Sequence, residues 1–191
     1  MPSMSFDMKD AVFTNLVNNT SRGSNRITAE EADPDRYNTK FIDTRVEYEG
    51  KEYRTTVRLI VVGRKIIHSL VGARASNAKN ATVHGVNTPI NSGLITHLFE
   101  TQIVARKPEL DALADKLDQC LGPGFYHHDL LIEKDTGDIY VCEVGIKFDA
   151  YAYGQRLESI RETTPCLSPF FTTEFAYGSA EAVLNRWETN A

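Results

Sequence analysis

The stretch GFYHHDLLIEKDTGDIYVCEVGIKF, residues 124–148, decides the fold prediction because it resembles two strands joined by a tight turn. Residues 135–137, Asp-Thr-Gly, fit a three-residue loop whose last position needs a left-handed backbone, which glycine supplies. Counting back in pairs from this loop puts Leu131 opposite Val141. The stretch therefore predicts an antiparallel hairpin of known register.

The same count places two carboxylates face to face, because Asp129 falls directly opposite Glu143. The Cβ atoms of such a pair lie about 4.5–5.5 Å apart, and like charges there are destabilising. Magnesium prefers one or two carboxylates together with phosphate oxygens and water. We therefore predict that Asp129 and Glu143 bind magnesium. The alternative is that both side chains point into solvent and repel each other weakly.

Upstream of the hairpin the pattern is also strand-like. Residues 39–50 and 53–63 alternate as a second hairpin, and Gly63-Arg64 suits a two-residue type II′ turn into a third strand at 65–73. Residues 76–92 have loop composition, with Val83, Val86 and Ile90 as their apolar side chains, and we expect a mobile lid there.

Helices are expected between and after these strands. One covers residues 94–105, and a second runs from Pro108 to Gly122 with Leu110, Leu113, Ala114, Leu117 and Leu121 on one face. Two more are expected near 151–162 and 179–188. Residues 1–36 are loop-rich, whereas 37–191 form one unit. The predicted fold class is α+β, a mainly antiparallel sheet with helices packed on one face.

Composition narrows the function class. At 191 residues the chain has room for one main core, and its net charge of -5 argues against nucleic acid as a partner. No stretch approaches the roughly 20 apolar residues of a membrane span, and no signal peptide is visible, so we expect a cytoplasmic protein without a membrane partner. Three widely spaced cysteines give neither a disulfide framework nor a zinc ribbon.

The segment FYHHDLLIEKDTGDIYVCEVGIKFD, residues 125–149, resembles the closing motif of ATP-grasp enzymes, in which an Asp, a Gly-containing hairpin and a Glu bind magnesium. Asp129 and Glu143 match those positions. Upstream, YRTTVRLIVVGRKIIHSLVGARAS is similar to the strand pair of that family, and Arg58 and Arg74 occupy the places of its catalytic arginines. The resemblance covers residues 39–149 and implies the C-terminal lobe of an ATP-grasp fold.

The resemblance also implies cofactors and substrates. Lys40, Phe41, Ile42 and Asp43 would lie in the strand that contacts adenine, and Asn80 in the loop NAKNATVHG that approaches phosphate. The implied activity is an ATP-dependent ligase using Mg²⁺ or Mn²⁺, which activates a small-molecule carboxylate as an acyl phosphate for capture by an amine or thiol.

Two features depart from the family. Gly145 stands where an Asn usually follows the metal-binding Glu, and the lobe that holds the phosphates has no visible counterpart. The missing lobe implies a homo-oligomer or a partner chain. The alternative function is a non-catalytic nucleotide-binding or scaffolding module with the same fold.

The remaining residues have structural interpretations as well as functional ones. Simple alternation puts Arg58 and Arg74 on opposite faces unless a bulge at Gly72 intervenes. His127 shares the face of Asp129 whereas His128 does not, and no third ligand supports zinc. We expect Cys142 to pack in the core.

Overall fold

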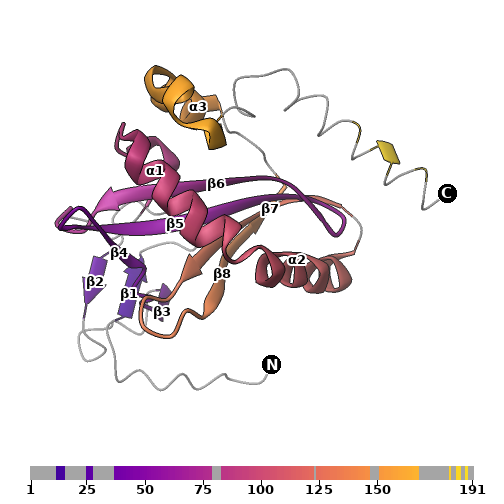
Figure 1. The fold of residues 1–191 in the computed structure, drawn as a ribbon. Coiled ribbons are helices and arrows are strands. Elements are labelled where there is room, and N and C mark those ends of the chain that lie inside the picture. Colours follow the sequence, from indigo (N-terminus) through magenta and orange to yellow (C-terminus); the bar gives the residue numbers. More distant parts are fainter. Residues whose placement is uncertain are drawn as a thin grey trace.

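The computed structural model describes residues 12–15, 25–27, 37–78, 83–122, 124–146 and 151–167, together with Glu181, Leu184, Asn185 and Glu188. The predicted α+β class is confirmed: helices accompany a curled antiparallel sheet (Figure 1). The expected helix at 179–188 falls largely outside the described residues, and the four described positions there are helical.

The main sheet contains five strands: β4 (Arg45–Tyr48), β5 (Lys51–Val62), β6 (Lys65–Ala75), β7 (Phe125–Ile132) and β8 (Ile139–Gly145). The long β5 lies at its centre, with β6 along one edge and β4 and β7 sharing the other edge. Strand β8 pairs with β7 and is the last strand on that side of the sheet. A smaller sheet joins β1 (Val12–Asn15), β2 (Asn25–Ile27) and β3 (Tyr37–Lys40) in the order β2-β1-β3.

Two tight turns fix the hairpins around β5. Glu49 and Gly50, with φ of 50° and 71°, join β4 to β5, as a type I′ turn requires. Gly63, with φ 57°, joins β5 to β6, and Val62 pairs with Lys65 across the predicted two-residue turn. The predicted strand at 39–50 is divided, because residues 41–44 are not part of a strand and only β3 and β4 remain of it.

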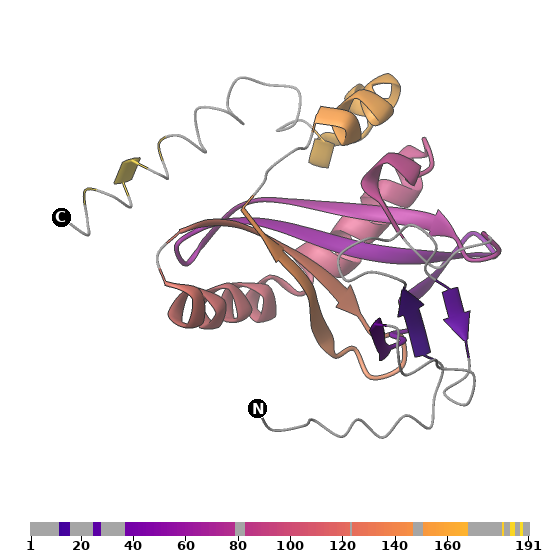
Figure 2. The same ribbon diagram turned by 180° about the vertical axis from the view of Figure 1, so that it is seen from behind.

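Helix α1 (Ser92–Phe99) continues through a π-helical turn, η3 (Glu100–Val104), toward α2 (Lys107–Leu121). Both helices lie over one face of the sheet, as the two opposite views show (Figures 1 and 2). The side chain of Asn91 caps α1 by accepting from Leu94 N at 2.9 Å, and Gly122, with φ 82°, ends α2.

The core fills the space between this face and the helices. Val57, Leu59 and Val71 from the sheet and Leu94 and Leu98 from α1 are fully buried. Leu110 and Ala114 are the buried residues of the predicted apolar face of α2, whereas Leu121 at its end is 43% exposed. Burial of apolar area at about 25 cal/mol per Å² makes this layer the main source of stability.

The predicted lid, residues 76–92, is attached to β6 through Thr88, a polar residue to which the sequence analysis gave no role. Thr88 is fully buried, and its Oγ1 accepts from Ala73 N at 3.1 Å, whereas Val86 and Ile90 are each 48% exposed. A short 3₁₀ turn, η2 (Gly85–Asn87), precedes it. The expected mobility of this loop stays a prediction.

Helix α3 (Tyr151–Leu157) packs against η2, and the 3₁₀ turn η4 (Glu158–Thr163) contacts α1. The predicted helix at 151–162 is therefore half α-helix and half 3₁₀. None of the helices in the described part of the chain is long and apolar enough to cross a membrane.

Candidate functional site

Three charged residues form one row across β5, β7 and β8, which we call the carboxylate row. Arg58 is the cross-strand partner of Asp129, and Asp129 is the partner of Glu143. Directly opposed residues project from the same face of a sheet. The prediction that Asp129 lies opposite Glu143 is confirmed.

The register that led to this prediction was nevertheless wrong near the turn. Leu131 pairs with Tyr140 rather than with Val141, because the connection between the strands is longer than a three-residue loop. The pairing then shifts by one residue between Asp129 and Leu130, leaving Cys142 as an extra residue in β8. This bulge returns Glu143 to its place opposite Asp129.

Arg58 holds Asp129 through both carboxylate oxygens. Its Nε donates to Oδ1 at 2.6 Å and its Nη2 to Oδ2 at 2.7 Å, with side chains only 30% and 20% exposed. This is a bidentate pair between neighbouring strands. Arg58 therefore compensates the charge of Asp129, a contribution that the sequence prediction of two facing carboxylates did not include.

Glu143 has no comparable partner. Its side chain is exposed, and it makes no hydrogen bond or ion pair within the part of the chain that the structure describes. The carboxylate row thus contains one cation and two anions, so a negative charge remains beside an already occupied arginine.

This donor set fits a cation that brings other ligands with it. No group of three His, Cys, Asp or Glu side chains within the described ranges is arranged to hold a metal ion. Magnesium commonly takes one or two carboxylates and completes its shell with phosphate oxygens and water. Asp129 and Glu143 could therefore supply at most part of the ligand shell of a magnesium ion.

The expectation that Arg58 and Arg74 lie on opposite faces was wrong. Arg74 pairs with Arg54, which lies four residues from Arg58 on the same face of β5. The predicted kind of irregularity exists, but the shift falls between Ile60 and Val61 and makes Ile67 the extra residue, not Gly72. Four residues along a strand span about 13 Å, so Arg58 and Arg74 lie on the same face of the sheet but too far apart for direct contact.

The four residues expected to contact adenine lie beside β8 and the β7–β8 turn. Lys40 ends β3, with its Nζ 5.6 Å from the ring centre of Tyr140. Phe41, Ile42 and Asp43 belong to the linker between β3 and β4, which is held to the β7–β8 turn by a 2.7 Å bond from Lys134 N to the Asp43 carbonyl. Asn80 lies outside the described residues.

A second arginine–carboxylate group, which we call the Arg45 cluster, lies beside this linker. Arg45 donates to Asp43 from Nη2 at 2.7 Å and to Glu52 from Nη1 at 3.1 Å, and Lys134 Nζ lies 3.5 Å from Glu52. The Arg45 guanidinium lowers the pKa of Asp43, partly offset by burial. The Arg45 cluster therefore contains two cationic and two anionic side chains, and their formal charges balance.

The two adjacent histidines of β7 are buried on opposite faces, as the alternation predicted. His128 is 1% exposed, and burial lowers its pKa, so it is a neutral core residue. His127 is 6% exposed, and a Cβ at Gly145 would lie 2.2 Å from its Cε1. The contact between His127 and Gly145 escaped sequence analysis, although a glycine inside a strand does signal a close approach.

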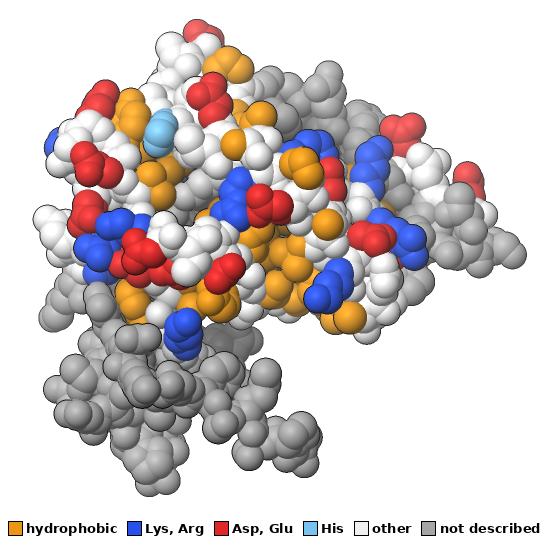
Figure 3. Space-filling view, turned by 60° about the horizontal axis from the view of Figure 1, so that its bottom comes forward, with side chains coloured by type: hydrophobic (Ala, Val, Ile, Leu, Met, Phe, Trp, Pro, Cys, Tyr) orange, Lys and Arg blue, Asp and Glu red, His pale blue; other side chains and the backbone are white. Residues whose placement is uncertain are grey.

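Cys142 does not pack in the core, which corrects the expectation for this thiol. It is exposed on β8, beside Val141 and Val144, which are 39% and 37% exposed. Ile146, just after the strand, is 79% exposed. The face at the bottom of Figure 1 shows hydrophobic side chains gathered among acidic and basic ones (Figure 3).

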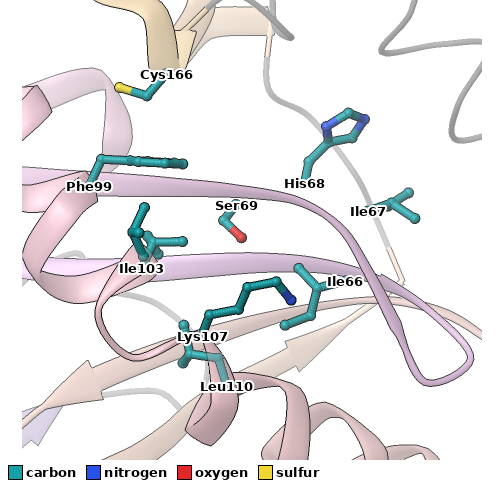
Figure 4. A pocket seen from close by; sticks show the side chains of 10 residues that line it. Ile66, Ile67, His68, Ser69, Phe99, Ile103, Lys107, Leu110 and Cys166 are labelled. Carbon is teal, nitrogen blue, oxygen red and sulfur yellow. The ribbon is translucent and has the colours of Figure 1, made fainter.

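The hollow drawn in Figure 4 lies on the helix side of the sheet, away from the carboxylate row. It has a volume of about 300 Å³ and is lined mainly by apolar side chains of β6, α1, η3 and α2, with Cys166 at its rim. Burial raises the pKa of Cys166 to about 11, so its thiol is protonated at neutral pH. Lys107 is paired with Asp111 at 2.6 Å. These groups give the hollow no reactive or anion-binding chemistry.

Searches with the sequence found no matching protein-family model and no matching curated protein.

Proposed function

We propose that this chain provides the metal-binding lobe of an ATP- and magnesium-dependent ligase related to the ATP-grasp enzymes. The observation that carries the proposal is the surplus carboxylate of Glu143, directly opposite an Asp129 that is already held in place by Arg58. Charge and spacing at this row suit Mg²⁺ bound together with the phosphates of ATP. Bound magnesium would offset negative charge on the phosphate oxygens.

In this proposal each residue of the chain has a positional task. Arg58 fixes the carboxylate of Asp129 through two hydrogen bonds, and each carboxylate oxygen keeps a further lone pair for a cation shared with Glu143. Arg74, on the same face beyond Arg54, contacts a more distant anionic group of the substrate. The linker 41–44 and Lys40 contact the base, and Asn80 the phosphates.

A small-molecule carboxylate and an amine are the substrates that accompany this reaction, and the protein acts in the cytoplasm. Phosphoryl transfer depends on positioning and charge neutralisation from several sides. One lobe leaves the triphosphate open to water, so we expect little ATP turnover by this chain alone. A second copy or a partner chain would complete the nucleotide site.

Binding of Mn²⁺ with a non-hydrolysable ATP analogue, followed by electron paramagnetic resonance, tests the proposal. We expect the wild-type chain to bind the complex and the Asp129→Asn and Glu143→Gln variants to bind it at least about tenfold more weakly, the usual order for lost metal contacts. Asp135→Asn is the matched control, because Asp135 is an exposed carboxylate in the turn of the same hairpin. Equal binding by all four proteins would refute the assignment.

The bidentate hold of Arg58 on Asp129 specifically favours a second candidate, a nucleotide-binding module without catalysis. In that case the arginine serves mainly to neutralise Asp129, and the nucleotide binds without dependence on a divalent cation. Calorimetric titration with the analogue in the presence of a chelator separates the two candidates, because only the second candidate binds the nucleotide without a divalent cation.

A further inference from the structure

The place of Glu143 depends on the bulge at Cys142. The pairing that leaves the turn, with Ile132 opposite Ile139 and Leu130 opposite Val141, would otherwise continue unchanged. Asp129 would then face Cys142. A register change of one residue moves every side chain to the other face of a sheet.

In that unbulged register Glu143 would lie opposite His128, on the face that carries the core, and Val144 would lie opposite His127. The carboxylate row would lose its second anion. Something in the sequence must therefore favour the bulged register over the simpler one.

His127 and Gly145 supply that preference. The imidazole of His127 lies so close to Gly145 that an added Cβ would be 2.2 Å from Cε1, 2.6 Å from Nε2 and 3.0 Å from Nδ1. His127 as a residue is only 6% exposed, so its ring has little room to move aside, and its Nδ1 is buried without a hydrogen-bond partner among the described residues. Shape rather than hydrogen bonding determines this contact.

Backbone conformation does not explain the glycine. Gly145 is not among the residues with positive φ, unlike Gly137 in the turn with φ 74°. An L-residue could adopt the backbone of position 145, but its side chain could not share the space of the ring. The requirement for glycine is therefore steric.

We propose that His127 is a positioning residue that selects the strand register, with Gly145 as the residue of β8 that can lie beneath its ring. The unbulged register would place the branched side chain of Val144 in the space of the imidazole, and this clash disfavours it. The bulged register follows, and with it the opposition of Asp129 and Glu143. The functional part of this inference rests on the proposed function.

Two variants test the lock between His127 and Gly145. His127→Ala removes the ring that disfavours the unbulged register, so backbone nuclear Overhauser contacts of Asp129 should shift from Glu143 to Cys142, and binding of Mn²⁺ with the ATP analogue should weaken about tenfold or more, as for other losses of supporting residues. His127→Phe keeps a ring without nitrogen at this position and should keep both the Asp129–Glu143 contacts and most of the affinity. Val141→Ala, an exposed residue on the same strand, is the control that should change neither.

A folded His127→Ala chain that keeps the Asp129–Glu143 contacts, or a folded His127→Phe chain that loses them, would overturn the lock. Gly145→Ala places a methyl group against the ring and should lower the stability of the chain, and the double variant His127→Ala/Gly145→Ala removes that clash and should recover the stability. A double variant no more stable than Gly145→Ala would contradict the lock. If the wild type shows no Mn²⁺–analogue binding, the proposed function fails while the contacts still decide the register.

Discussion

The carboxylate row and the Arg45 cluster are built alike, yet they differ in charge. In each, one arginine binds both carboxylate oxygens of an aspartate, and a glutamate lies next to that pair. Glu52 of the Arg45 cluster is met by Arg45 and approached by Lys134, whereas Glu143 of the carboxylate row meets no cation in the described part of the chain. The first group is complete by itself, and the second leaves a carboxylate for an outside cation.

The comparison shows why an ion pair alone does not identify a site. Arg45 and Arg58 are equally good arginine–carboxylate contacts by geometry, and structural ion pairs are common on protein surfaces. What distinguishes the row is the second carboxylate, placed by the bulge at Cys142. Bulges often re-aim side chains beside functional sites.

The largest effect is expected from Arg58→Gln. The substitution removes two charge-assisted hydrogen bonds from a mostly buried Asp129, which should lower the free energy of unfolding by about 2 kcal/mol. It also leaves two facing carboxylates, so Mn²⁺ alone should bind the variant more tightly than the wild type and restore part of its stability. Urea denaturation with and without Mn²⁺ measures both. Weaker Mn²⁺ binding in the variant would mean that Arg58 supports the cation rather than replacing it.

Arg45→Gln should have a smaller effect and no response to Mn²⁺. The Arg45 side chain is 35% exposed, so water screens the pair, and Lys134 still lies near Glu52. We expect a loss of about 1 kcal/mol in the same urea experiment. A manganese-dependent recovery here would remove the distinction between the two groups.

The sequence analysis placed Asp129 opposite Glu143 correctly because two differences between the predicted and the observed register cancel. The longer turn displaced the register by one residue, and the bulge at Cys142 displaced it back. Local patterns gave the strands, the glycine turns and α2, because each depends on neighbouring residues. A bulge inside β8 has no comparable signal, so the agreement at Asp129 and Glu143 did not follow from a correct register.

The long-range contacts could not be predicted in this way. Arg58 and Asp129 are 71 positions apart, and their pairing depends on β7 joining the edge of β5 that β4 also uses. Likewise, the shift at Ile67 decides that Arg74 shares a face with Arg58. Such pairings follow from the packing of the whole sheet rather than from local propensity.

Acid should weaken the Arg45 cluster through Asp43. Because the Arg45 guanidinium lowers the pKa of Asp43 below its usual 3.8, the folded state favours the ionised carboxyl. The resulting stability is fully present above pH 3.8 and is lost as the pH falls through the folded-state pKa. Asp43→Asn should remove this part of the acid dependence, under about 1 kcal/mol for a partly exposed pair. Identical acid profiles of the variant and the wild type would show that this ion pair adds nothing.

The smallest effect is expected at Cys142, whose thiol reports on the row directly. Although part of Cys142 is exposed, the partial desolvation of its thiol raises its pKa, and the charges of Asp129 and Glu143 raise the pKa further, so removing one charge should increase the thiolate fraction. Glu143→Gln should therefore speed alkylation of Cys142 at pH 8, by less than about threefold because charges near the surface are screened.

Cys166 is the internal control, since burial is the main cause of its raised pKa and it lies on the helix side of the sheet. Mass spectrometry of the alkylated peptides separates the thiols. An unchanged rate at Cys142 would place the Glu143 carboxylate too far from the bulge to act on it, and would weaken the case that the two carboxylates share one cation.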